Sequence, residues 1–120
     1  MEKKYISTRN QQKEINFYQA IVQGIGEDGG LLVPDFDFTK MDLDVLSKLN
    51  YVDLATEVLS TFVPEEGKEL IHDACLNAYG KGLFPEIVVP VKKAGDVYVA
   101  ELFHGQTAAF KDMALSLLPI

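Results

Sequence analysis

The chain has 120 residues and a mass of 13.3 kDa, with 48% apolar and 24% charged residues. This composition is typical of a soluble globular domain and excludes a disordered or fibrous chain. Eleven basic and eighteen acidic residues give a net charge of −7, which excludes partners bound mainly through phosphate neutralisation, so we expect neither nucleic acid nor an anionic membrane as a partner. No apolar segment is typical of a signal peptide or a membrane span, and Cys75 is the one cysteine. A reducing cytoplasm is therefore the simplest compartment.

The amino-terminal part is predicted to contain a short strand, a helix and an extended segment. The strand covers 5–7, and Asn16 is a good N-cap for a helix over 17–23, whose apolar residues follow helical spacing. Residues 24–29 fit the nucleotide-binding spacing G-x-G-x-x-G. That motif follows a strand and opens a helix, whereas here it follows a helix and leads to the extended segment 31–34. We therefore interpret it as a helix stop and a turn.

The middle of the chain is predicted to be helical. Apolar residues at helical spacing indicate helices over 41–48, 51–62 and 65–80. Cys75 falls on the apolar face of the third helix, which favours a small core residue over a reactive thiol. His72, beside an aspartate on the same helix, is interpreted as a surface residue.

A metal site is not indicated. An EF-hand loop that began at Asp35 would need glycine where Lys40 stands and glutamate where Leu46 stands. The two histidines, His72 and His104, lie far apart without a ligand pattern around them. We expect no metal.

The carboxyl-terminal part is predicted to form two strands, 87–91 and 97–103, joined as a hairpin, and then a helix over 107–118. This helix is apolar on all sides, so it must be buried on all sides, yet little sequence follows to cover it. We therefore expect either the front part of a longer protein or cover from another chain. Gly80–Gly82 is the predicted boundary between a mainly helical domain, residues 1–82, and a unit of hairpin and helix, residues 83–120.

Lys111 lies within this apolar stretch, with Ala108 and Leu115 at helical spacing from it. Lysines are rarely buried unless paired, and desolvation favours a neutral amine that attacks carbonyl groups. One interpretation is therefore a Schiff-base lysine, and the alternative is a lysine that extends to the surface or pairs with a carboxylate. His104, in the loop before the helix, is equally consistent with functional contact and with a structural role.

The segment Glu101–Asp112 resembles the ELFHGPT-x-AFKD motif of the threonine synthase family, whose lysine carries pyridoxal phosphate. Upstream, Ser7–Arg9 resembles the family's S-T-R element, and Phe17–Pro34 resembles its F-x-Q-A…D-G-G-L-x-V-P stretch. The matches occur in the family's order and extend over essentially the whole chain.

The resemblance implies an α/β enzyme of fold type II that converts O-phosphohomoserine and water to threonine and phosphate. The chain would then be an α+β fragment: the mainly helical amino-terminal domain, then the first hairpin and helix of the catalytic domain. Lys111 would be the catalytic residue and would hold the cofactor with Phe110. His104, Thr107 and Asp112 are the implied substrate-facing residues.

One residue and one segment depart from the family pattern. Gln106 stands where the family has proline, which makes the approach to the helix less rigid. The glycine-rich loop that holds the cofactor phosphate in fold type II follows the lysine and is not in this sequence. We therefore expect the chain to be inactive without the missing carboxyl-terminal part of the enzyme.

Two alternatives remain open at this point. The parent enzyme could be a threonine-synthase-like phospholyase that acts on a related phosphorylated compound. Otherwise the chain is a non-enzymatic interaction module whose exposed apolar helix docks on a partner or on a second copy of itself.

Overall fold

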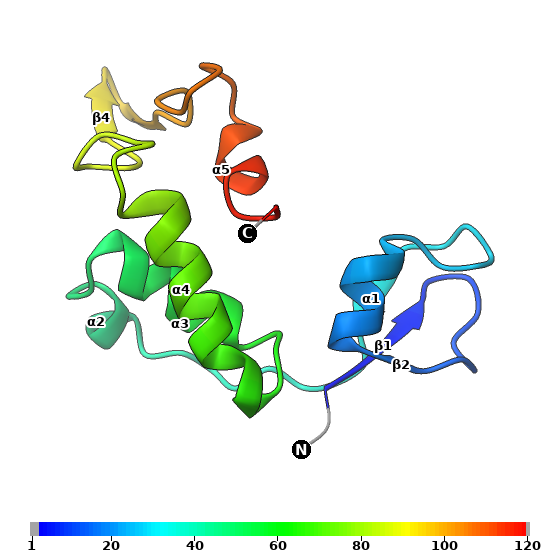
Figure 1. The fold of residues 1–120 in the computed structure, drawn as a ribbon. Coiled ribbons are helices and arrows are strands. Elements are labelled where there is room, and N and C mark those ends of the chain that lie inside the picture. The colour runs from blue at the N-terminus through cyan, green and yellow to red at the C-terminus, as the bar shows by residue number, and fades with distance from the viewer. Residues whose placement is uncertain (1–2, 120) are drawn as a thin grey trace.

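The structure, a computed structural model, describes residues 3–119 and is a mixed α/β arrangement of two small antiparallel sheets and short helices (Figure 1). In chain order the elements are β1 (Lys4–Ser7), β2 (Ile15–Asn16), α1 (Phe17–Gln23), β3 (Leu32–Pro34), α2 (Leu43–Leu46), α3 (Tyr51–Ser60), the 3₁₀ turn η1 (Glu65–Gly67), α4 (Lys68–Tyr79), β4 (Val91–Ala94), β5 (Val97–Ala100) and α5 (Asp112–Leu115). Among the helices of residues 3–119, none has the length and apolar character that a membrane crossing needs.

The amino-terminal unit is a three-stranded antiparallel sheet in the order β2-β1-β3, next to α1. The Asn16 side chain accepts a hydrogen bond from the Gln19 amide at 2.9 Å, and the Gln19 side chain accepts one from the Asn16 amide at 3.0 Å. This capping box starts α1 where the sequence predicts it. Gly24, at φ 72°, ends the helix, so the interpretation of the glycine-rich stretch as a helix stop and turn is confirmed. The two-residue strand β2 was not predicted.

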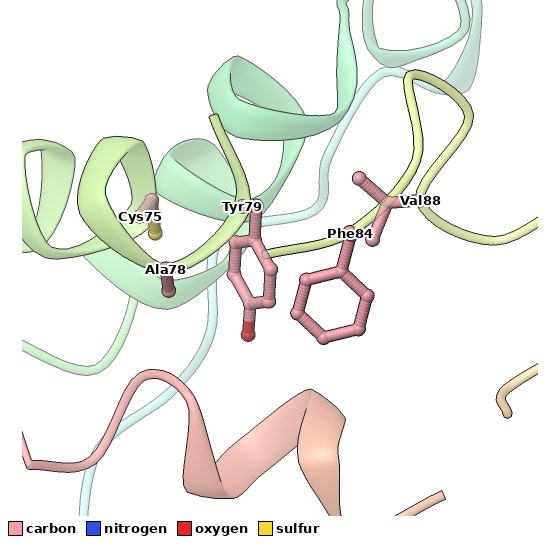
Figure 2. Packing of buried hydrophobic residues seen from close by; sticks show 5 residues of the cluster. All are labelled: Cys75, Ala78, Tyr79, Phe84 and Val88. Atoms are coloured by element: carbon pink, nitrogen blue, oxygen red, sulfur yellow. The ribbon is translucent and has the colours of Figure 1, made fainter. Parts of the chain in front are cut away.

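The helical core is the pair α3 and α4, which pack against each other along their apolar faces. Figure 2 shows Tyr79 beside Phe84, with the Tyr79 hydroxyl pointing toward α5. The buried cluster consists of Cys75, Ala78, Tyr79, Phe84 and Val88. The prediction of Cys75 as a core residue is confirmed, and burial raises the pKa of its thiol. Both predicted helices exist here, although the third begins only after the 3₁₀ turn η1.

The first strand of the hairpin lies further along the chain than the sequence predicts: it is β4 (Val91–Ala94) rather than residues 87–91. The pairing instead joins Val91 to Ala100 and Ala94 to Val97, with Gly95 in the tight turn at φ 62°. Val88 is buried in the helical core, so the chain before β4 covers α4 and cannot join the sheet. The apolar run of residues 87–91 therefore reflects the packing of Val88 and Val89 against the helical core rather than strand pairing.

The helix expected over 107–118 is also wrong, because only Asp112–Leu115 is α-helical. Ala108 has a φ of 57°, which no helical residue adopts. Around it the amides of Asp112 and Met113 bond three residues back, to the carbonyls of Ala109 and Phe110. Burial on all sides is wrong as well, since Phe110 is 66% exposed.

The molecule is more open than a compact domain of its size. Its radius of gyration is 16.3 Å, against about 13.6 Å for a compact chain of this length. Its accessible surface is 8609 Å², against roughly 6,500 Å² for a compact monomer of this mass. The sheet around β1 lies to one side of the helical pair in Figure 1, and an extended segment joins the two. Much apolar surface is therefore available for cover.

Candidate functional site

Lys111 lies at an open apolar hollow of about 460 Å³ between the helical core and the carboxyl-terminal segment. The hollow is lined by Tyr51, Val89, Leu102, Phe110, Lys111, Met113, Ala114 and Leu115. Lys111 is the one charged residue among them. Lys111 and Phe110, the two sequence neighbours predicted to hold the cofactor, both line this hollow.

Of the two interpretations of Lys111, a desolvated lysine and a lysine that extends to the surface, the structure agrees with the second, because Lys111 is exposed. The apolar neighbours that predicted burial lie on a loop and a single helical turn, so they do not form a closed layer around the amine. Desolvation by this chain alone does not explain a reactive lysine here.

The loop that precedes Lys111 is closed by the side chain of Asp112. The Thr107 amide donates to Asp112 Oδ2 at 2.8 Å, and the Thr107 hydroxyl donates to Asp112 Oδ1 at 2.6 Å. Asp112 is only 5% exposed. Its hydrogen bonds to the Thr107 side chain and backbone lower its pKa below the usual 3.8. Thr107 and Asp112, both predicted to face substrate, therefore bond to each other.

His104 is held by a carboxylate that the sequence analysis did not single out. Its Nε2 lies 2.7 Å from Glu101 Oε2, and Lys92 Nζ lies 3.1 Å from Glu101 Oε1. These hydrogen bonds, the one to His104 first, lower the pKa of Glu101 below its usual value. The signal was present in the sequence, since an acidic residue stands three positions before the histidine. His104 is not among the residues that line the Lys111 hollow.

The S-T-R element forms a second polar cluster in the amino-terminal sheet. Ser7 is buried and donates from Oγ to Asp28 Oδ1 at 2.7 Å, and the Gly30 amide donates to the same oxygen at 2.9 Å. Arg9 Nη1 donates to the Asp28 carbonyl at 3.0 Å. The cluster ties the end of β1 to the glycine-rich turn. The hydrogen bonds from Ser7 and from the Gly30 amide lower the pKa of the Asp28 carboxyl.

The hollow fits one part of a pyridoxal phosphate molecule. An exposed amine suits covalent attachment, and the apolar wall with Phe110 suits an aromatic ring. The phosphate needs amides or further cations, which the described lining does not supply, so groups outside this hollow would hold it. Within residues 3–119, no group of three or more His, Cys, Asp or Glu residues is arranged to hold a metal ion.

Comparison with known proteins identifies the family. The sequence profile described as threonine synthase N terminus matches residues 4–79, more than half of the chain. The chain belongs to the threonine synthase family. It is 37% identical to the threonine synthase of Methylobacillus glycogenes over 96% of this chain and 26% of that protein. It is 33% identical to threonine synthase-like 2 of Homo sapiens over 93% of this chain and 24% of that protein.

A solved structure agrees with this family assignment. The pyridoxal-phosphate-bound threonine synthase from Brucella melitensis matches with a TM-score of 0.83 and 33% identity, over 97% of this chain and 26% of that chain. The predicted resemblance to threonine synthase and the mixed α/β class are confirmed. The chain spans about a quarter of the length of these threonine synthase relatives.

Proposed function

We propose that this chain is the amino-terminal part of a pyridoxal-phosphate-dependent threonine synthase, with Lys111 as the lysine that binds the cofactor. The reaction would convert O-phosphohomoserine and water to threonine and inorganic phosphate. The observation that carries the proposal is the position of Lys111. Lys111 lines an apolar hollow together with Phe110, inside the segment that resembles the family's lysine motif.

The chemistry divides between the cofactor and the chain's own residues. Pyridoxal phosphate, when bound, supplies an electron sink for carbanions formed on the substrate. The Lys111 amine would hold the cofactor and, once released, would carry protons between substrate carbons. Phe110 and the apolar wall would flank the cofactor ring and exclude water. His104, held by Glu101, would face substrate or cofactor from the loop before Thr107.

The exposed apolar surface supports packing of this segment against the rest of the enzyme. Phe110 and Leu115 are exposed at the hollow, and Phe103 and Leu118 are exposed in the same carboxyl-terminal part of the chain. The surface beyond that of a compact domain, about 2,000 Å², exceeds the roughly 800 Å² that each partner buries in a standard interface. In the proposed enzyme this face packs against the part that follows in the relatives, which would also bring the phosphate-binding groups. The single, buried cysteine supports a cytoplasmic location.

A chimeric enzyme tests this function. Residues 1–120 replace the matching quarter of the Methylobacillus glycogenes threonine synthase, and phosphate and threonine release are measured with O-phosphohomoserine. We expect activity, and we expect Lys111→Ala to lower kcat by at least about 100-fold, because proton transfer alone contributes 10²- to 10⁴-fold. Lys93→Ala, on the exposed hairpin, is the matched lysine control.

Three results would contradict the proposal. A folded chimera without activity would show that this segment cannot serve a threonine synthase. Equal activity of the Lys111→Ala variant would remove Lys111 from the chemistry. Threonine release by the 120-residue chain alone would show that no further part is needed.

The similarity to human threonine synthase-like 2, at 33% identity, keeps a related phospholyase as the second candidate function. The product distinguishes the two enzymes: threonine supports the synthase, and 2-oxobutyrate supports the phospholyase. An interaction module without enzymatic activity predicts instead that the chain associates through the apolar face. Sedimentation that shows a well-folded monomer would contradict this docking role.

A further inference from the structure

We propose that Asp112 is a positioning residue: it closes the loop 107–112 through Thr107 and thereby sets the backbone from which Lys111 projects, without contact to substrate. This inference deepens the proposed function and rests on it for the role of Lys111. It reassigns Asp112, which the family resemblance alone suggested as a substrate-facing residue.

The first argument is that both oxygens of the Asp112 carboxylate accept hydrogen bonds inside the protein. One oxygen accepts from the Thr107 amide at 2.8 Å and the other from the Thr107 hydroxyl at 2.6 Å, and the side chain is buried. A carboxylate that binds a substrate needs an accessible oxygen. Both Asp112 oxygens instead bind a residue five positions earlier in the same loop.

The second argument is that the backbone of this loop is strained. Ala108 adopts a φ of 57°, a left-handed conformation that is unfavourable for a residue with a Cβ. Gly105 approaches so closely that a Cβ added to it would lie 2.4 Å from Asp112 Cβ. Such strain persists where surrounding interactions determine the conformation, and the two bonds to Asp112 are those interactions.

The third argument is that Lys111 belongs to the loop 107–112, which the hydrogen bonds between Thr107 and Asp112 close. The bonds from Thr107 to Asp112 fix both ends of a segment in which Lys111 is the last residue before the carboxylate. A catalytic group held before the reaction loses less freedom in the transition state. The exposed Lys111 side chain has no hydrogen-bond or ion-pair partner among residues 3–119, so its backbone is what the loop fixes.

Nuclear magnetic resonance of the 120-residue protein tests the loop without cofactor or activity. The Thr107 amide proton reports its bond to Asp112 through its chemical shift and its exchange with solvent. Asp112→Ala removes both acceptor oxygens, so we expect exchange of the Thr107 amide to rise at least about tenfold. Asp73→Ala, at an exposed aspartate on α4, is the matched control.

The pH profile separates this role from a general loss of fold. The groups that hold the carboxylate are neutral, and within residues 3–119 no charged side chain lies within ion-pair distance of it, with Lys111 as its sequence neighbour. We expect the Thr107 amide shift to titrate in one step whose midpoint lies below 3.8, the usual pKa of aspartate. In Asp112→Asn this step is absent. An unchanged exchange rate of the Thr107 amide in Asp112→Ala, or an unchanged titration in Asp112→Asn, would overturn the proposal.

The chimera then distinguishes positioning from substrate contact. If Asp112 positions Lys111, Asp112→Ala lowers kcat by about 10- to 100-fold and leaves KM for O-phosphohomoserine within about twofold. Thr107→Ser, which keeps the hydroxyl donor, retains kcat, whereas Thr107→Val lowers it. A raised KM with unchanged kcat would instead make Asp112 a substrate contact and overturn the proposal. An inactive wild-type chimera would contradict the proposed function alone, because the resonance experiment still decides whether Asp112 closes the loop.

Discussion

The α3–α4 pair buries its apolar side chains, whereas the segment from β5 to α5 exposes most of its own. Cys75 and Ala78 on α4 are fully buried, but Phe110 is 66% and Leu118 69% exposed. The helical pair is held by side-chain packing, and the Lys111 segment is held by polar bonds within its loop. A region that forms one wall of a site needs a defined backbone but not a core of its own.

The largest loss of stability is expected from a substitution of Tyr79, the residue that links the two regions. Tyr79 packs against Tyr51 and Phe84, at ring-centroid distances of 5.1 and 5.7 Å, and its hydroxyl donates to the Met113 carbonyl at 2.5 Å. We expect Tyr79→Ala to lower the free energy of unfolding by about 3–5 kcal/mol, because it removes a buried ring and leaves a cavity. Urea denaturation followed by circular dichroism measures this. Tyr98→Ala, on the exposed strand β5, is the control, and equal loss in both variants would contradict the comparison.

A smaller effect is expected where the Lys111 segment is most tightly packed. In Gly105→Ala the new methyl would lie 2.4 Å from Asp112 Cβ, so the loop must shift. We expect a loss of about 1–3 kcal/mol, the usual range for overpacking. The exposed neighbour variant Gln106→Ala should stay within about 0.5 kcal/mol. Thermal unfolding of both variants decides whether the loop has this close contact.

The polar contacts of Glu101 predict a still smaller, pH-dependent effect. Its pKa is lowered by hydrogen bonds to His104 and Lys92, so between the lowered and the usual value the unfolded chain binds more protons. Stability therefore rises with pH through that window. The advantage of the wild type over Glu101→Gln should be full above pH 4.5 and disappear as the pH falls through the lowered pKa. A constant difference across an acid titration of unfolding would show that Glu101 does not act through its charge.

The smallest effect on stability is expected for Phe110, although it lies beside Lys111. Because its ring is mostly exposed, Phe110→Ala should change the free energy of unfolding by no more than about 0.5 kcal/mol. Urea denaturation of the 120-residue chain measures this. A loss near that of Tyr79→Ala would mean that the Lys111 segment has a core of its own.

Capping residues and apolar spacing predicted the helices whose ends and faces depend on nearby residues in the sequence. Asn16 starts α1 and Gly24 ends it, because a cap side chain and a residue with positive φ act within a few positions. The apolar stripe of α4 likewise predicted the burial of Cys75. The motif around Lys111 identified the family, which the comparisons confirm.

The errors have one physical cause. An apolar pattern indicates that residues are buried, but it does not indicate which segment of the chain they pack against. Val88 is buried against α4 and so cannot join the hairpin, and the apolar residues around Lys111 lie on a loop rather than a helix. The pairing of Asp112 with Thr107 and of Glu101 with His104 depends on backbone turns that no periodicity encodes.

By itself, therefore, the sequence determined the family and the helices α1, α3 and α4, since these depend on residue type and short-range spacing. Only the tertiary structure decided that Lys111 is exposed at an open hollow and that Asp112 is turned inward. Both depend on where segments meet after the chain folds, because burial and hydrogen-bond partners are properties of neighbours in space.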